Sequence, residues 1–186
     1  MPRDQKILKL KKRILDLENE NEVLKNENEV LRKRLDRARG GPGEKYVAEL
    51  TGGVLAKYKD GYDIEMQNGT RLEVKLSKPN TPSGSKTKRW NWSNLLGLSD
   101  TRTFDFLVLL GEKDTRYEKQ YPPDLDYVCF LVPRSDVNNI KNSWAPNLAL
   151  NTNLATAKAR KAEVLKRYLI RSREQFKGLS PNAAAP

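Results

Sequence analysis

Apolar and polar residues alternate strictly between Tyr62 and Ser77. On both sides of the central Asn68-Gly69, the even-numbered positions are apolar and the odd-numbered positions are polar or charged. The apolar set is Tyr62, Ile64, Met66, Leu72, Val74 and Leu76, and the polar set is Asp63, Glu65, Gln67, Arg71, Glu73 and Lys75. Alternation with a period of two is typical of strands with one buried face. Asn and Gly tolerate positive φ, so Asn68-Gly69 indicates the turn of a β-hairpin.

The alternation also predicts the register of this hairpin. Both apolar sets reach one core only if the loop has an odd number of residues, because paired positions then share parity. A loop of residues 68–70 satisfies this condition. It sets Asp63 opposite Lys75 and Glu65 opposite Glu73, so three carboxylates and a lysine share one face. Like charges directly opposite each other are destabilising, and the second pair therefore predicts a cation nearby.

A heptad repeat runs through residues 7–35. Its a positions are Ile7, Ile14, Asn21, Asn28 and Leu35, and its d positions are Leu10, Leu17, Leu24 and Leu31. Leu at each d position with Asn at two a positions favours a parallel dimer, because buried Asn side chains then pair in register. Residues 1–39 are therefore predicted to form a leucine-zipper-like dimerisation helix, native or fused. An amphipathic helix docked on its own domain is the alternative.

The remaining chain predicts one α/β domain that follows a Gly/Pro linker at 40–43. The expected elements are a helix over 44–58, the hairpin, a mobile basic loop over 77–89, a short helix at 90–98, strands at 104–111 and 127–133, a basic helix over 153–176 and a disordered tail at 179–186. The two strand segments are continuous apolar runs, as expected of central strands that are covered on both faces. This order predicts an α/β sandwich around a mixed sheet.

Charge and composition narrow the function. The formal net charge is +11, and the basic excess lies at the two ends of the 186-residue chain, which favours a polyanionic partner such as nucleic acid. Histidine is absent, so a His base, nucleophile or metal ligand is excluded. The single cysteine, Cys129, lies in an apolar run and is expected in the core. No long apolar run or secretory leader is present, so we expect a soluble, intracellular protein, cytoplasmic or nucleoid-associated, without membrane contact.

The hairpin carries the pattern D-x9-E-V-K, made by Asp63, Glu73 and Lys75, and the predicted helix before it bears Glu49. In this order of elements the pattern resembles the core of the PD-(D/E)XK nuclease superfamily, which is restriction endonuclease-like. Tyr62 stands where the family name has proline. The resemblance implies an αβα core with a central mixed sheet in a nuclease domain over residues 44–178, which ends with the basic helix.

The resemblance also implies a Mg²⁺-dependent site for phosphodiester hydrolysis, in which Mn²⁺ can substitute. The implied metal ligands are Asp63, Glu73 and the backbone carbonyl of Val74. Glu49 would complete the shell through water, and Glu65 is its competitor as a ligand. Lys75 would lie beside the attacking water and stabilise the anionic transition state. Without the resemblance, an ordinary solvent-facing strand pair with a surface ion pair accounts for the same alternation.

Candidate DNA-binding residues follow the hairpin. They are Lys78, Lys86, Lys88, Arg89, Trp90 and Trp92. The cations would contact phosphates and the indoles would stack on bases, whereas loop solubility and core packing are the structural alternatives.

Together these features predict a homodimeric, metal-dependent DNA endonuclease of the type II restriction kind, which makes double-strand breaks at a palindromic or nearly palindromic site in duplex DNA. Its zipper residues are Leu10, Ile14, Leu17, Asn21, Leu24, Asn28, Leu31 and Leu35. A Holliday-junction resolvase or a nicking repair nuclease of the same superfamily is an alternative. A non-catalytic DNA-binding or scaffolding zipper dimer is another.

Overall fold

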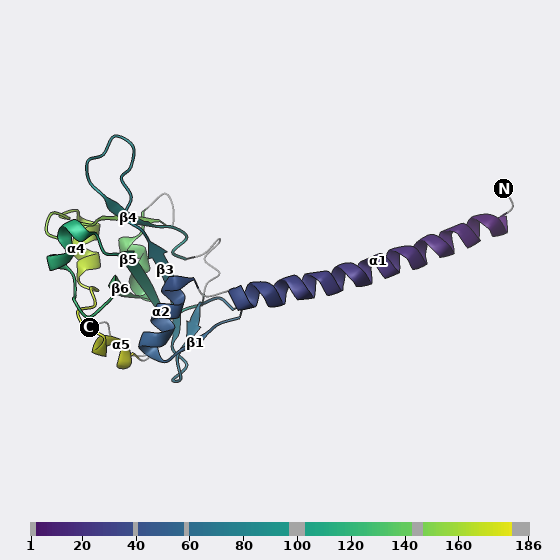
Figure 1. The fold of residues 1–186 in the computed structure, drawn as a ribbon, viewed down its shortest axis with the longest axis horizontal. Helices are drawn as coiled ribbons and strands as arrows, with labels where there is room; N and C mark the ends of the chain where they lie inside the picture. Colours follow the sequence, from purple (N-terminus) through teal and green to yellow (C-terminus); the bar gives the residue numbers. More distant parts are fainter. Residues whose placement is uncertain (1–2, 39–40, 58–59, 97–102, 143–146, 180–186) are drawn as a thin grey trace. The chain divides into compact units, whose positions relative to one another are not determined.

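The computed structural model describes residues 3–38, 41–57, 60–96, 103–142 and 147–179. The chain divides into two compact units, residues 1–39 and 40–186. The first unit contains a single helix, α1, and the second contains an α/β domain (Figure 1).

Helix α1 runs without a break from Arg3 to Ala38, over the whole predicted heptad repeat. Within its unit, large apolar side chains at the a and d positions are exposed, among them Leu10, Ile14 and Leu24. Leu15 and Val23 are exposed as well, although they occupy b and c positions outside the seam. Among the helices that the structure describes, none combines the length and the apolar character needed to span a bilayer.

A mixed sheet of five strands forms the centre of the α/β domain, in the order β1-β2-β3-β5-β6. Its strands are β1 (Val54–Leu55), β2 (Ile64–Glu65), β3 (Arg71–Ser77), β5 (Phe106–Glu112) and β6 (Tyr127–Pro133). Strands β3 and β5 are parallel, and all other neighbours are antiparallel. The two apolar runs of the sequence are β5 and β6, and both are buried along nearly their whole length. The predicted α/β fold with a mixed central sheet is confirmed.

Different layers cover the two faces of this sheet. Even-numbered residues of β3 and β5, such as Val74 and Val108, face a core shared with α2 (Pro42–Thr51) and α5 (Glu174–Lys177). Odd-numbered residues of β5, such as Leu107, face a second core. That core is shared with a small antiparallel sheet of β4 (Arg89–Trp92) and β7 (Leu148–Asn151), and with α3 (Val137–Ile140) and α4 (Arg160–Lys166). Among the described residues the domain also contains the short 3-10 helices η2 (Thr115–Gln120) and η3 (Arg134–Asp136).

The predicted helix over residues 44–58 is wrong at both ends. Helix α2 begins at Pro42 within the predicted linker, where proline suits the first helical turn. It ends at Thr51 because Gly52 adopts a left-handed conformation, with φ of 66°. Gly53 then passes so close to Ile64 that a side chain would not fit there. The two glycines therefore end the helix, and Val54 and Leu55 form β1.

The predicted helix at 90–98 is also wrong for its first residues. Trp90 and Trp92 alternate with outward-facing residues in β4, which pairs with β7. Residues 97–102 lie outside the described residues. This strand was missed because its partner lies nearly sixty residues further along the chain, and a tertiary pairing of this kind leaves no local signal.

The predicted single helix over 153–176 is divided into α4 and α5. Between them the chain runs along the edge of β6, where Leu131 N–H donates to Tyr168 O and Ile170 N–H donates to Cys129 O. Backbone pairing with this edge strand replaces the helix. Of the predicted tail, Leu179 is buried, and residues 180–186 lie outside the described residues.

Candidate active site

The hairpin that carries the motif keeps the predicted parity but not the predicted register. Its three-residue loop is Gln67-Asn68-Gly69, where Gly69 has φ of 81°, and Met66 N–H donates to the carbonyl of Thr70. Ile64 is therefore the partner of Leu72, two positions away from the predicted register. A shift of two residues keeps every side chain of β2 on its predicted face.

This register separates Glu65 from Glu73. Glu65 is paired with Arg71, and its carboxylate lies 3.9 Å from the Arg71 guanidinium. It also accepts a hydrogen bond of 3.0 Å from the hydroxyl of Tyr62. The predicted opposition of two glutamates is therefore wrong, and Glu65 has partners of its own.

Tyr62 is a feature of the site that the sequence pattern misplaced. Its ring packs against the core on the far side of the sheet from Ile64, because regular β2 pairing begins only at Ile64. The Arg71 guanidinium lies 5.0 Å from the centre of the ring. Burial, followed by the hydrogen bond to Glu65, raises the pKa of the Tyr62 hydroxyl. Local alternation could not reveal this change of face.

Asp63 lies where the hydrogen-bonded ladder between β2 and β3 is interrupted. Hydrogen-bonded pairs alternate along an antiparallel ladder, so the pair Ile64–Leu72 would be followed by Tyr62–Val74. Instead, the N–H of Val74 donates to Oδ2 of Asp63 at 2.8 Å. The Asp63 carboxylate thus takes the place of the Tyr62 carbonyl as the acceptor for the N–H of Val74, the residue between Glu73 and Lys75.

Glu73 and Lys75 extend from the same face of β3, one on each side of Val74. Nζ of Lys75 lies 2.5 Å from Oε1 of Glu73. The Glu73 side chain is 0% exposed, and that of Lys75 is 20% exposed. Desolvation of a carboxylate costs several kcal/mol, which pairing with a cation only partly offsets. Charged side chains are almost never fully buried unless they are paired, so this pair marks a candidate functional site.

The oxygen atoms of this cluster are of the kind that hard divalent cations prefer. Asp63 and Glu73 supply carboxylates, and such ions prefer oxygen ligands. In a β-strand the N–H and C=O of one residue face the same side, so the Val74 carbonyl belongs to the edge that Asp63 occupies. Across the described ranges, no group of three or more Asp, Glu, His or Cys side chains is arranged to hold a metal. The candidate ligand set is therefore two carboxylates and one backbone carbonyl.

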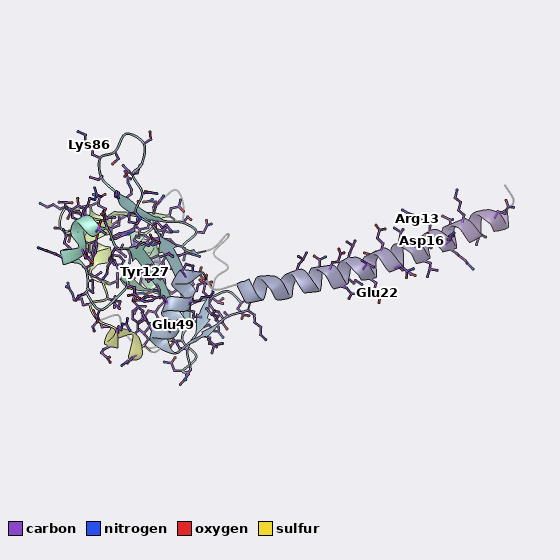
Figure 2. The ribbon with its side chains drawn as sticks, viewed as in Figure 1. Arg13, Asp16, Glu22, Glu49, Lys86 and Tyr127 are labelled. Atoms are coloured by element: carbon purple, nitrogen blue, oxygen red, sulfur yellow. The ribbon has the colours of Figure 1, made fainter. Side chains whose placement is uncertain are left out.

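Glu49 does not join this set. It is exposed on α2 (Figure 2). This helix covers the face of the sheet opposite to the one from which Glu73 extends. Tyr46 and Val47 form the buried side of the helix. The structure therefore brings together Asp63, Glu73, Val74 and Lys75, but neither Glu49 nor Glu65.

The two candidate stacking residues lie in the core. Trp90 and Trp92 are 0% and 1% exposed. Their indole N–H groups donate 2.8 Å hydrogen bonds to the carbonyls of Glu112 and Leu110, respectively. Both rings also contact Phe130. In this structure their faces are not accessible to nucleic acid bases.

The four candidate phosphate contacts lie at or near the surface between β3 and β4. Lys78 is exposed, and its ammonium lies 3.2 Å from the Glu112 carboxylate. Lys86 is exposed, whereas Lys88 and Arg89 are half-buried. All four residues lie in one segment, residues 78–89.

Cys129 is buried in β6, as predicted. Burial raises the pKa of its thiol to about 12, which leaves it protonated near neutral pH. A thiol in that form is a poor nucleophile, so Cys129 is a core residue and not part of the site.

No model of a known protein family matches the chain, and comparison with the curated proteins gave no significant match.

Proposed function

We propose that the chain is a metal-dependent DNA endonuclease of the PD-(D/E)XK type. One observation carries the proposal: Glu73 and Lys75 form a buried ion pair on β3, with the Asp63 carboxylate held on the backbone between them. Burial of charged groups lowers stability, and a catalytic role in phosphodiester hydrolysis would explain why the cluster is present.

The order of elements supports the same proposal. Helix α2 is followed by the antiparallel strands β1, β2 and β3, and then by β5, which is parallel to β3. We propose that these elements are a restriction-endonuclease-like αβα core. The aspartate then lies just before β2 and the E-V-K segment lies in β3, as the sequence resemblance implies.

Each residue has a separate role in this proposal. Asp63, Glu73 and the Val74 carbonyl would hold Mg²⁺, which supplies charge to polarise the phosphate and to acidify a bound water. The Lys75 ammonium, oriented by Glu73, would stabilise the negative charge that develops on the phosphate oxygens as water attacks phosphorus. The water oxygen would bond to phosphorus and release a proton to solvent, while one P–O ester bond breaks and its leaving oxygen takes a proton from solvent.

The proposed enzyme acts as a parallel homodimer through α1. The exposed a and d residues of this helix form the seam that the heptad repeat predicts, with Asn21 and Asn28 inside it. Three of the four g-to-e′ pairs are of opposite charge, namely Arg13–Glu18, Glu20–Lys25 and Glu27–Arg32. A two-fold dimer would bring two sites to the two strands of one duplex, which favours a double-strand break.

The test is cleavage of a mixed-sequence DNA library in Mg²⁺, in Mn²⁺ and in EDTA, followed by sequencing of the new ends. A restriction-like enzyme gives metal-dependent ends with a fixed flanking sequence. Four-way junctions and mismatched duplexes, tested in parallel, identify a resolvase or a nicking repair enzyme. Intact DNA under all conditions, together with salt-sensitive binding that is indifferent to metal, would instead identify a non-catalytic DNA-binding dimer.

A further inference from the structure

A loop that a single β-bridge closes at its base projects from the domain between β3 and β4. We call residues 78–89 the basic arm. Asn80 and Arg89 are paired across it, with backbone hydrogen bonds of 3.0 and 2.9 Å in the two directions. A bond of 3.0 Å from Ser85 N–H to the carbonyl of Pro82 closes the tip, where Gly84 has φ of 74°. Figure 1 shows the arm extending beyond β4, and Figure 2 labels Lys86 on it.

The base of the arm is firmly attached to the sheet. The N–H of Asn91 donates to Oγ of Ser77 at 2.8 Å, and the Ser77 hydroxyl lies 3.1 Å from the carbonyl of Asn91. The Lys78 ammonium and the Trp90 indole both contact Glu112 on β5. Because β3 and β4 hold both ends of the arm, its position is linked to that of Lys75, which lies on β3.

The composition of the arm fits DNA better than protein. Residues 74–99 contain five cations and no carboxylate. Between Pro79 and Arg89 the arm has no large apolar side chain, whereas the cores of protein interfaces are enriched in such side chains. Apart from Pro79 and Pro82, its other side chains are small hydroxyl or amide groups, namely Asn80, Thr81, Ser83, Ser85 and Thr87. Cations contact phosphates, and groups of this second kind donate and accept hydrogen bonds at base edges.

We infer that the basic arm enters the major groove of duplex DNA on one side of the scissile phosphate. The groove is about 12 Å wide and admits two antiparallel chain segments, such as the two sides of this loop. The inference rests on the proposed function, because it takes Lys75 as the position of the phosphate. The tip, residues 82–85, lies seven to ten residues beyond Lys75 in the chain. A fully extended chain of that length spans about 23–33 Å, so the tip contacts DNA no more than about ten base pairs from the cut.

The test compares two double variants of the full-length protein. Lys86→Ala/Lys88→Ala removes two charges from the arm. Lys45→Ala/Lys177→Ala removes two charges from α2 and α5, which cover the other face of the sheet. Equilibrium binding to a 40-base-pair duplex is measured without divalent metal over a range of salt concentrations. Thermal unfolding is measured for each variant to verify that it is folded.

The slope of log K against log salt should fall by about two in the arm variant, since each lost phosphate contact lowers it by about 0.9. The control variant should keep the wild-type slope. Equal slopes in all three proteins, an equal fall in both variants, or no DNA binding by the wild type would overturn the inference. Because no metal is present, this result is independent of cleavage: an arm-dependent slope in a protein that never cuts DNA would reject the nuclease and retain the arm.

Discussion

At the scale of single residues, the central feature is a carboxylate that solvent does not reach. Glu73 is fully buried beside Lys75, and a buried ion pair of this kind contributes little net stability. Removal of one partner is far more costly than removal of both, because it leaves the other charge buried without its counter-ion. The pair is therefore expected to be retained for chemistry and not for folding.

This expectation gives a stability prediction. Lys75→Met should lower the free energy of unfolding by about 3 kcal/mol, because the Glu73 charge loses its cation. Glu73→Gln/Lys75→Met should recover most of that loss, since no charge remains at the pair. Urea unfolding at pH 7 measures both variants. A double variant less stable than the single Lys75→Met variant would show that the pair is a structural ion pair.

Asp114 provides a contrasting case, in which a buried carboxylate has a structural role. It accepts hydrogen bonds from Nε and Nη2 of Arg116, at 3.0 and 2.7 Å, and from the hydroxyl of Thr152 at 2.8 Å. The Arg116 guanidinium is the main reason that the pKa of the Asp114 carboxyl lies well below its usual value. These bonds join η2 to the residue that follows β7, far from the candidate site in the sequence.

The lowered pKa predicts a pH dependence. A carboxyl group with a lower pKa in the folded state adds stability above its unfolded pKa of about 4, and that stability is lost as the pH falls. Asp114→Asn should therefore lower the free energy of unfolding by about 1–3 kcal/mol at pH 7. The difference from wild type should shrink as the pH falls from 4 to 2.5, as followed by urea unfolding. Glu118→Gln, an exposed change in η2, is the control and should have little effect; a pH-independent Asp114 difference would contradict the account.

At the scale of secondary-structure elements, prediction succeeded where the signal was local and periodic. The apolar runs gave β5 and β6, and the alternation gave the faces of Ile64 and Leu72. The register of the hairpin depended on which three residues form the loop. Asn68 decides this, because its side chain accepts from Thr70 N–H and donates to the carbonyl of Leu179, a contact that no local pattern encodes.

The same limit explains which site residues were predicted. Asp63, Glu73 and Lys75 are neighbours through one hairpin, so the spacing of the motif was sufficient to group them. The prediction for Glu49 depended on where helix α2 lies, and α2 covers the other face of the sheet. The burial of Trp90 depended on β7, which is remote in the sequence.

Helix α1 allows an element-scale test with a matched control. Leu17 and Leu24 occupy d positions, whereas Leu15 occupies a b position and is also exposed. Leu17→Glu/Leu24→Glu should convert a dimer into a monomer, because charges in the seam of a coiled coil lose apolar contact and repel each other. Leu15→Glu should leave the dimer intact. Sedimentation equilibrium at micromolar concentration gives the mass of each protein, and a wild-type monomer would contradict the zipper.

At the scale of the whole molecule, three parts of the chain have separate proposed tasks. In the proposal, the heptad helix would join two chains, the hairpin of residues 63–75 would supply the catalytic groups, and the basic arm would bind the duplex. The excess of positive charge at the two ends of the chain adds a general attraction for DNA. Substitutions can be made in each part separately. A loss of dimerisation, of DNA binding or of cleavage can then be assigned to the part that was changed.

The most direct test of the central claim is the rate of plasmid cleavage by an Asp63→Asn variant. Asparagine retains an oxygen that can accept the Val74 N–H, so the hairpin is preserved while the charge is lost. In Mg²⁺ the account predicts a rate at least 100-fold below wild type, in line with the loss of one group that stabilises a transition state. Glu49→Gln and Glu65→Gln should stay within a few-fold of wild type. Asp63→Asn activity equal to wild type, or cleavage that persists in EDTA, would contradict the account.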